Sequence, residues 1–290
     1  MLYLLLSILT STSLIVILRL YDKWKVNSSF GIVFNYFFCV ITGLFFVDDF
    51  NLFSKIPSWN GFPYVLILGI AFILIFQIVG KATLISGVAT TSIAMKLSFV
   101  IPAIFAVWLY GDSLSTIKIC GIACAILSVF LISYEKSKTT DTENNTITNR
   151  RILYPFLIFV MCGLCDATFN HIQKKFIPAG WDHQVTITVF LIAAIVGIAM
   201  NAHKKELYQW KNVTAGIALG IPNYFSLYFL LKTLKTLPME SSTIFPINNL
   251  GIVCLSALSG YILFHEKFSR QKIAGIILAI ASIIIIGFVH

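Results

Sequence analysis

The 290-residue chain is 58% hydrophobic and only 11% charged, and it carries a net charge of +9 at neutral pH. An ordinary soluble domain carries about 25% charged residues, so this composition leaves too little polar surface to cover a water-soluble protein. We therefore expect an integral membrane protein that contacts the lipid bilayer. Lys and Arg concentrate between the apolar runs, as in loops of membrane proteins, so we expect no nucleic-acid partner.

Ten runs with few or no charges are each long enough to cross a hydrocarbon core as a helix, which takes about 17 to 25 residues. In chain order they are residues 2–18, 26–47, 56–80, 82–111, 113–134, 152–171, 184–202, 212–231, 241–264 and 273–290. The first run lacks a basic leader and a small-residue cleavage site, so we expect a helix there and not a signal peptide. The runs do not alternate between polar and apolar residues, which favours an all-α membrane protein with ten transmembrane helices.

Two distant segments of the chain resemble each other. Residues 115–128, STIKICGIACAILS, match residues 269–282, SRQKIAGIILAIAS, at a spacing of 154, and upstream segments match at 151. We therefore divide the chain into a first five-helix repeat at 1–134, a polar linker at 135–151 and a second repeat at 152–290. An odd number of spans inserts the second repeat in the opposite orientation. Such inverted repeats are typical of secondary transporters, whose substrate site lies near the membrane midplane.

Each repeat ends in a helix, a short acidic turn and a glycine-containing helix. The stretches are residues 102–121, PAIFAVWLYGDSLSTIKICG, and 256–275, SALSGYILFHEKFSRQKIAG, with Asp112 and Glu266 in the turns. With ten helices, this pattern resembles the EamA-like permeases of the drug/metabolite transporter superfamily. The resemblance implies a permease for small organic metabolites, often amino acids, with both termini in the cytoplasm. The excess of Lys and Arg after odd-numbered helices instead predicts both termini outside, so their side stays open.

Lys96 stands alone in an apolar run, in TSIAMKLSFVIP. At 1.5 Å per residue it lies about 12 Å from the helix start at Val88, close to the midplane. A charge there costs about 2.5–3.5 kcal/mol, so it should face a partner or a water-filled cavity. We expect Lys96 to bind an anionic group of the substrate, most simply a carboxylate. The alternative is a lysine that closes a helix contact or extends toward the membrane surface.

Three asparagines accompany this lysine in the expected substrate site. Asn248 and Asn249 occupy the positions in the second repeat that correspond to Lys96, although asparagines also hold helices together. Asn223 and Tyr224 follow Pro222, whose missing N–H tends to kink a helix and expose carbonyls to a cavity.

Two further polar residues lie inside the runs. Gln77 is expected at a similar depth to the residues after Pro222, so we include it among the substrate-binding residues. Asp166 is the acidic residue that lies well inside a run, and it could neutralise Lys96 or carry a coupling proton. A polar cluster at a helix end is the alternative for Asp166.

These features predict a secondary transporter of an amino acid or another carboxylate-bearing metabolite, working by alternating access. We expect an anionic or zwitterionic small-molecule partner, no cofactor and no metal, and a homodimer stays an open alternative. A flippase for a lipid-linked carrier would share the fold, and a membrane receptor with a buried lysine is a weaker alternative. The chain lacks nucleotide-binding and hydrolase motifs such as G-x-x-x-x-G-K-[ST] and G-x-S-x-G, so neither ATP drive nor an enzyme is expected.

Overall fold

The computed structural model describes residues 1–47, 49–102, 104–105, 116–133, 142–178, 180–204, 206, 209–237 and 241–288. Within these ranges the chain is helical and contains no strand. The elements are α1 (Leu2–Lys23), α2 (Ser28–Leu44), α3 (Leu52–Lys55), η1 (Ile56–Ser58), α4 (Phe62–Ser86), α5 (Val88–Leu97), α7 (Thr116–Ser133), α8 (Thr142–Lys175), α9 (Asp182–Asn201), α10 (Trp210–Thr236), α11 (Ser241–Phe264) and α12 (Arg270–Phe288).

Local sequence explains where several helices begin and end. The side chain of Asn27 caps α2 by accepting a hydrogen bond from the Ser29 amide, at 3.0 Å. Proline in the first turn of α4 suits a helix start because its missing N–H has no helical partner there. Between α4 and α5, Gly87 adopts φ +90°, which a glycine tolerates without the steric cost of a side chain.

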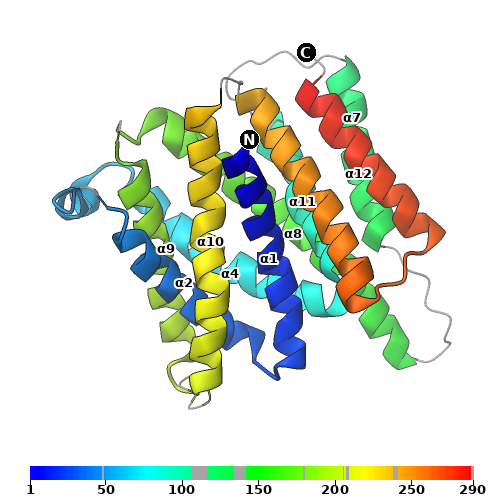
Figure 1. The fold of residues 1–290 in the computed structure, drawn as a ribbon, viewed down its shortest axis with the longest axis horizontal. Helices are drawn as coiled ribbons and strands as arrows, with labels where there is room; N and C mark the ends of the chain where they lie inside the picture. Colours follow the sequence, from blue (N-terminus) through cyan, green and yellow to red (C-terminus); the bar gives the residue numbers. More distant parts are fainter. Residues whose placement is uncertain are drawn as a thin grey trace.

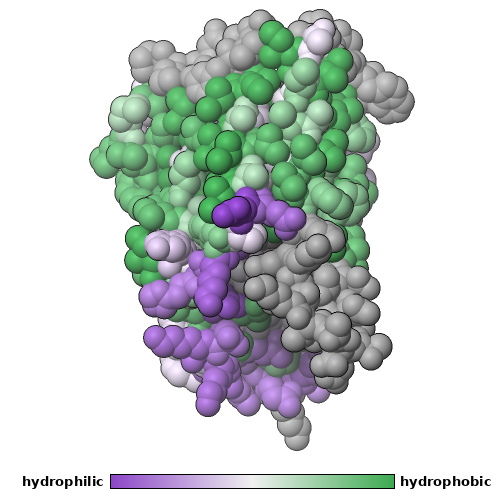
Figure 2. Space-filling model, turned by 90° about the vertical axis from the view of Figure 1, so that its right-hand side faces the viewer, coloured by the Kyte–Doolittle hydropathy of each residue, from purple (hydrophilic) through white to green (hydrophobic). Residues whose placement is uncertain are grey.

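Six helices are long and apolar enough to cross a membrane, and three shorter apolar helices accompany them within the described residues. The six are α1, α4, the 152–169 part of α8, the 183–201 part of α9, the 210–233 part of α10 and the 244–264 part of α11. Large apolar side chains face outward, among them Ile67 and Ile262. Figure 2 shows hydrophobic residues over most of one face, with hydrophilic residues gathered toward its lower end. The chain is therefore a multi-pass helical membrane protein, whereas the number of spans stays a prediction.

The helices pack into one bundle with two groups of buried side chains (Figure 1). In the larger group, α10 packs on α1 and α2, and α4 packs on α8 and α9. In the smaller group, α7 packs on α12 and α11 packs on α5. Both groups contain helices from either half of the sequence. The expected linker at 135–151 lies partly in α8, which begins at Thr142, while residues 134–141 lie outside the described residues.

Close contact between α2 and α10 depends on two glycines spaced four residues apart. A Cβ at Gly216 would approach the backbone of Phe34 to 2.8 Å, and one at Gly220 would approach the carbonyl oxygen of Asn35 to 2.6 Å. Small residues at such positions allow helices in membranes to approach closely, where no hydrophobic force drives them together.

The contact between α7 and α12 is reciprocal. Ser128 Oγ donates a hydrogen bond to the Gly275 carbonyl at 2.6 Å, and Ser282 Oγ donates to the Gly121 carbonyl at 2.8 Å. Ser282 and Gly275 lie 154 residues after Ser128 and Gly121, which is the spacing that relates the two matching segments.

The acidic turn of the second half contacts the break between α4 and α5. Glu266 accepts a hydrogen bond from the Val88 amide at 2.6 Å, at the exposed N-terminal end of α5. Its other oxygen lies 3.5 Å from the ammonium of Lys272. Negative charge at a helix N-terminus is favourable, so Glu266 serves as a cap supplied by a distant part of the chain. Its expected counterpart, Asp112, lies outside the described residues.

Candidate functional site

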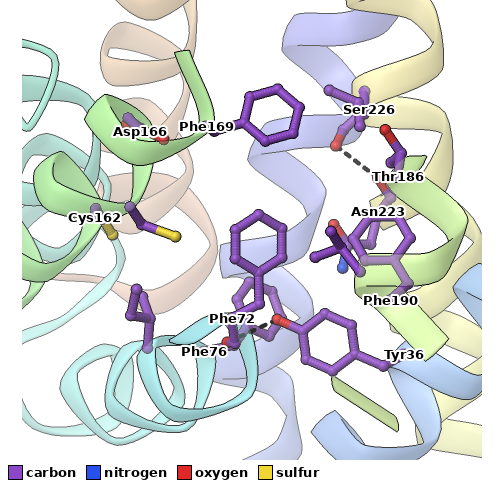
Figure 3. Close-up of a pocket in the computed structure, with 14 residues that line it drawn as sticks. Tyr36, Phe72, Phe76, Cys162, Asp166, Phe169, Thr186, Phe190, Asn223 and Ser226 are labelled. Atoms are coloured by element: carbon purple, nitrogen blue, oxygen red, sulfur yellow. Dashed lines mark hydrogen bonds between the residues drawn. The ribbon is translucent and has the colours of Figure 1, made fainter. Parts of the chain in front are cut away.

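A cavity of about 280 Å³ lies inside the bundle between α2, α4, α8, α9 and α10 (Figure 3). Helices from both halves of the sequence contribute to its wall. The lining residues are Tyr36, Phe72, Ile75, Phe76, Cys162, Cys165, Asp166, Phe169, Thr186, Val189, Phe190, Asn223, Ser226 and Leu227. The lining is mostly apolar with a few polar groups, which is the usual character of a small-molecule site.

One side of the cavity carries a carboxylate. Cys162, Asp166 and Phe169 recur at helical spacing along α8 and so share one face of it. The Asp166 side chain is exposed to the cavity, and Ser98 Oγ lies 3.4 Å from its Oδ2. Lys96 attracts this carboxylate electrostatically. Within the described residues, the ion pair with a separation below 4 Å is Lys272–Glu266. The Lys96 ammonium therefore lies more than 4 Å from the Asp166 carboxylate.

Aromatic rings form a second part of the wall. The ring of Tyr36 lies 5.8 Å from that of Phe76 and 5.9 Å from that of Phe190, measured between centroids. Phe72 also lies 6.3 Å from Phe190. The Tyr36 hydroxyl donates a hydrogen bond to the backbone carbonyl of Phe72 at 2.9 Å, which ties α2 to α4. Figure 3 shows these rings gathered on the side of the cavity away from Cys162.

The α10 wall is polar and follows Pro222. The Asn223 side chain donates from Nδ2 to Oδ1 of Asn35, at 3.1 Å, and Ser226 Oγ donates to the Asn223 carbonyl at 2.8 Å. Asn35 is fully buried, and its own Nδ2 has no hydrogen-bond partner. Buried amide groups normally form hydrogen bonds, so the unpaired Nδ2 of Asn35 lowers the stability of the fold. The hydrogen bond with Asn223 offsets part of this loss.

Two of the predicted site residues, Asp166 and Asn223, line the cavity. Tyr224, the neighbour of Asn223, does not: its side chain is buried, and its hydroxyl lies 2.9 Å from Nε2 of His183. A one-residue step along a helix rotates the side chain by about 100°, which carries Tyr224 away from the cavity face.

The remaining predicted residues do not line the cavity. Lys96 is on α5, and Gln77 on α4 has a buried Nε2 without a partner. Asn248 on α11 is buried with an unpaired Oδ1, and Asn249 beside it is half-buried. The cavity therefore does not bring Lys96 and the two α11 asparagines together as one substrate site.

Sequence reasoning missed most of the apolar lining. Phe72 and Phe76 on α4 are spaced four residues apart, and Cys162 and Phe169 share the Asp166 face of α8. This helical spacing was the available signal, but it is shared by many packing residues. Cys162 and Cys165, one helical turn apart and also suited to simple packing, line the cavity beside Asp166.

Comparison with known proteins adds a distant relationship. A Haemophilus influenzae protein without an assigned function is 25% identical over 96% of this chain and 94% of its own. Two Bacillus cereus proteins, each named a probable glucose uptake protein GlcU, are 22% and 21% identical over 68% of this chain and 67% of theirs. A protein crystal structure with 13% identity shares the fold at a TM-score of 0.56, covering 96% of this chain and 95% of that one. No family model matches the chain.

Proposed function

We propose that this protein is a secondary transporter that carries a small organic metabolite through the cavity by alternating access. The observation that carries the proposal is a carboxylate-bearing internal cavity whose wall comes from both halves of the sequence. Secondary transporters bind their substrates between such halves, near the middle of the membrane. The two relatives named as glucose uptake proteins also support transport over catalysis.

The proposal includes two inverted five-helix repeats, as in the drug/metabolite transporter superfamily. The reciprocal bonds of Ser128 and Ser282 support it, because two elements related by a twofold axis exchange equivalent contacts. Alternating access would then be a rocking of one half against the other around the cavity. The Glu266 cap, which joins the second half to α5, would stabilise one end position of that movement.

For the substrate we propose an amino acid or a related carboxylate-bearing compound. Asp166 is placed to accept hydrogen bonds from an ammonium group, while Lys96 on α5 supplies positive potential from outside the cavity lining. The cavity volume of about 280 Å³ lies at the lower end of small-molecule pockets, which span about 300–1,000 Å³, and so suits a small metabolite. This size favours a metabolite over a lipid-linked carrier, which is the alternative cargo for this fold.

A second candidate substrate is a hexose. Two relatives bear the name of glucose uptake proteins, and the lining combines aromatic faces with the amide of Asn223 and the carboxylate of Asp166. Such a lining can stack on the apolar face of a sugar and accept hydrogen bonds from its hydroxyl groups.

Reconstitution in liposomes tests the proposal. Uptake of radiolabelled amino acids, organic acids and hexoses is measured with the wild type, Asp166→Asn and the surface control Asp22→Asn. We expect saturable uptake of at least one class that is reduced at least tenfold by Asp166→Asn and is unchanged in the control. Uptake that ignores the cavity carboxylate would contradict the assignment of this cavity. Folded protein that moves no compound of the panel would contradict the proposed function.

A further inference from the structure

The hydrogen-bond direction of the groups lining the cavity restricts which ligand can bind. A carbonyl oxygen can only accept, so a hydroxyl that bonds to a carbonyl must donate its proton there. The Tyr36 hydroxyl donates to the backbone carbonyl of Phe72, and the Ser226 hydroxyl donates to the backbone carbonyl of Asn223 (Figure 3). Both hydroxyls therefore have their proton committed inside the protein and offer a ligand only acceptor lone pairs.

The side-chain amide of Asn223 also offers an acceptor. One of its two Nδ2 hydrogens is donated to the buried Oδ1 of Asn35, at 3.1 Å, and its own side-chain Oδ1 is available to a ligand. The Asp166 carboxylate, which is an acceptor when ionised, faces the same cavity. Four of the polar lining groups, from α2, α8 and α10, thus present acceptors to the interior. The Thr186 hydroxyl and the thiols of Cys162 and Cys165 complete the polar part of the lining.

Cationic groups do not compensate for these acceptors. Among the described residues that line the cavity there is no Lys, Arg or His, and Lys96 lies outside the lining. An anionic ligand would meet the Asp166 carboxylate and lone pairs, without a charged donor in direct contact. Like charges in a low-dielectric site repel strongly, so a carboxylate is a poor match for this wall.

The rest of the wall suits a cation with an apolar body. The faces of Phe72, Phe76, Phe169 and Phe190 surround the same space. An ammonium group near an aromatic face is attracted by the ring quadrupole, and the apolar remainder of such a ligand gains from burial. Recognition of organic amines commonly combines these two features with an anionic side chain.

We propose that the cavity recognises its substrate through an ammonium group held by Asp166 and the acceptors of Tyr36, Asn223 and Ser226, so that the cargo is an organic amine. This inference rests on the proposed transport function. Of the substrates proposed above it keeps those that carry an amino group, and it discards carboxylates without one. It assigns recognition to the amino end of the substrate, and the carboxylate of an amino acid adds nothing to its affinity.

A matched set of four ligands tests this inference. 2-Phenylethylamine, phenylalanine and 3-phenylpropionate share an aromatic body and carry, in turn, an ammonium, both charges, and a carboxylate, and glucose is the neutral donor-rich comparison. Binding is measured by calorimetry with purified protein in lipid nanodiscs, and flux is measured in liposomes. We expect the amine to bind at least tenfold more tightly than 3-phenylpropionate and glucose, and at least as tightly as phenylalanine.

Matched variants test which side chains hold the ammonium group. Asp166→Asn should weaken amine binding at least tenfold, while Asp22→Asn, the same change at an exposed position, should not alter it. Tyr36→Phe should weaken amine binding two- to fivefold, with Tyr261→Phe at an exposed position as its control. The thermal unfolding midpoint of each variant is measured first, and its affinity is compared with the wild type only if it is folded. A misfolded variant is then not mistaken for a loss of binding.

The outcomes separate the inference from the transport proposal. Amine binding without flux would uphold the ammonium site and contradict transport. Flux of 3-phenylpropionate or glucose without amine binding would uphold transport and overturn the ammonium site. Amine binding that is unaffected by Asp166→Asn would overturn the inference directly, and the absence of all binding and flux would overturn both.

Discussion

Glu266 and Asp166 are two acidic residues in an apolar bundle, and their surroundings differ. The Glu266 side chain is 9% exposed and contacts both the Val88 amide and the Lys272 ammonium. Asp166 faces the cavity, and in the described part of the chain its carboxylate accepts a hydrogen bond from the Ser98 hydroxyl, at 3.4 Å. A carboxylate whose acceptors are filled by the protein holds the fold together, while one that keeps acceptors open toward a cavity is available to a ligand.

The largest effect that would sharpen this comparison is on stability at Glu266. Glu266→Ala removes the cap of α5 and leaves Lys272 half-partnered in an apolar region, so we expect a loss of ~3 kcal/mol in unfolding free energy. The thermal unfolding midpoint in detergent should fall clearly, and the protein that stays folded should keep the ligand affinity of the wild type. A midpoint unchanged from the wild type would show that Glu266 does not hold the fold together.

The converse prediction concerns the stability of Asp166→Asn. Because this carboxylate has few protein partners and an unfavourable position in an apolar bundle, its neutral isostere should leave the unfolding midpoint unchanged or raise it by a few degrees. Thermal unfolding of the ligand-free variant, compared with Asp22→Asn, checks this. A fall as large as that of Glu266→Ala would show that Asp166 also holds the fold together.

Lys96→Met separates the two readings of the cavity. If Lys96 only lends positive potential near Asp166, removing it should strengthen 2-phenylethylamine binding about two- to fivefold, because a nearby like charge opposes a cation. If Lys96 itself holds a substrate carboxylate, the variant should lose binding of 3-phenylpropionate and phenylalanine. Calorimetry with the three aromatic ligands distinguishes these results in one protein.

The smallest expected effect is at Ser226. Ser226→Ala removes one uncharged acceptor from the cavity and leaves the Asp166 carboxylate in place, so amine binding should weaken only about two- to threefold. Ser58→Ala is a suitable control, since Ser58 also donates to a carbonyl three residues earlier but lies in an exposed segment. An effect as large as that of Asp166→Asn would contradict the ranking of the carboxylate above the neutral acceptors.

The helical membrane class followed from composition, because a deficit of charge has one simple physical explanation. Asp166 and Asn223 could be predicted as cavity residues because a polar side chain in an apolar run needs a partner or water. The same rule also selected Lys96, Asn248 and Gln77, which do not line the cavity. Position along a run gives depth in the membrane, but not which way a residue faces or which helices surround it.

The aromatic part of the wall could not be recognised from the sequence. With 25 phenylalanines in the chain, the four that line the cavity have no feature that marks them. Their role depends on the packing of α4 against α8 and α9, which is set by contacts between distant segments. The hydrogen bond from the Tyr36 hydroxyl to the Phe72 carbonyl likewise could not be predicted, because it depends on how α2 packs on α4.

Because two separate hydrogen bonds join α7 and α12, their contact tolerates a mutation that removes one of them. Ser128 and Ser282 do the same job at two places, so the loss of either hydroxyl leaves its counterpart in place. Hydrogen bonds between membrane helices contribute about 0.6 kcal/mol each on average, so one such loss is a small fraction of the total. Under the proposed duplication, the two bonds descend from one contact but now depend on two separate serines. A mutation of one serine therefore leaves the bond of the other in place.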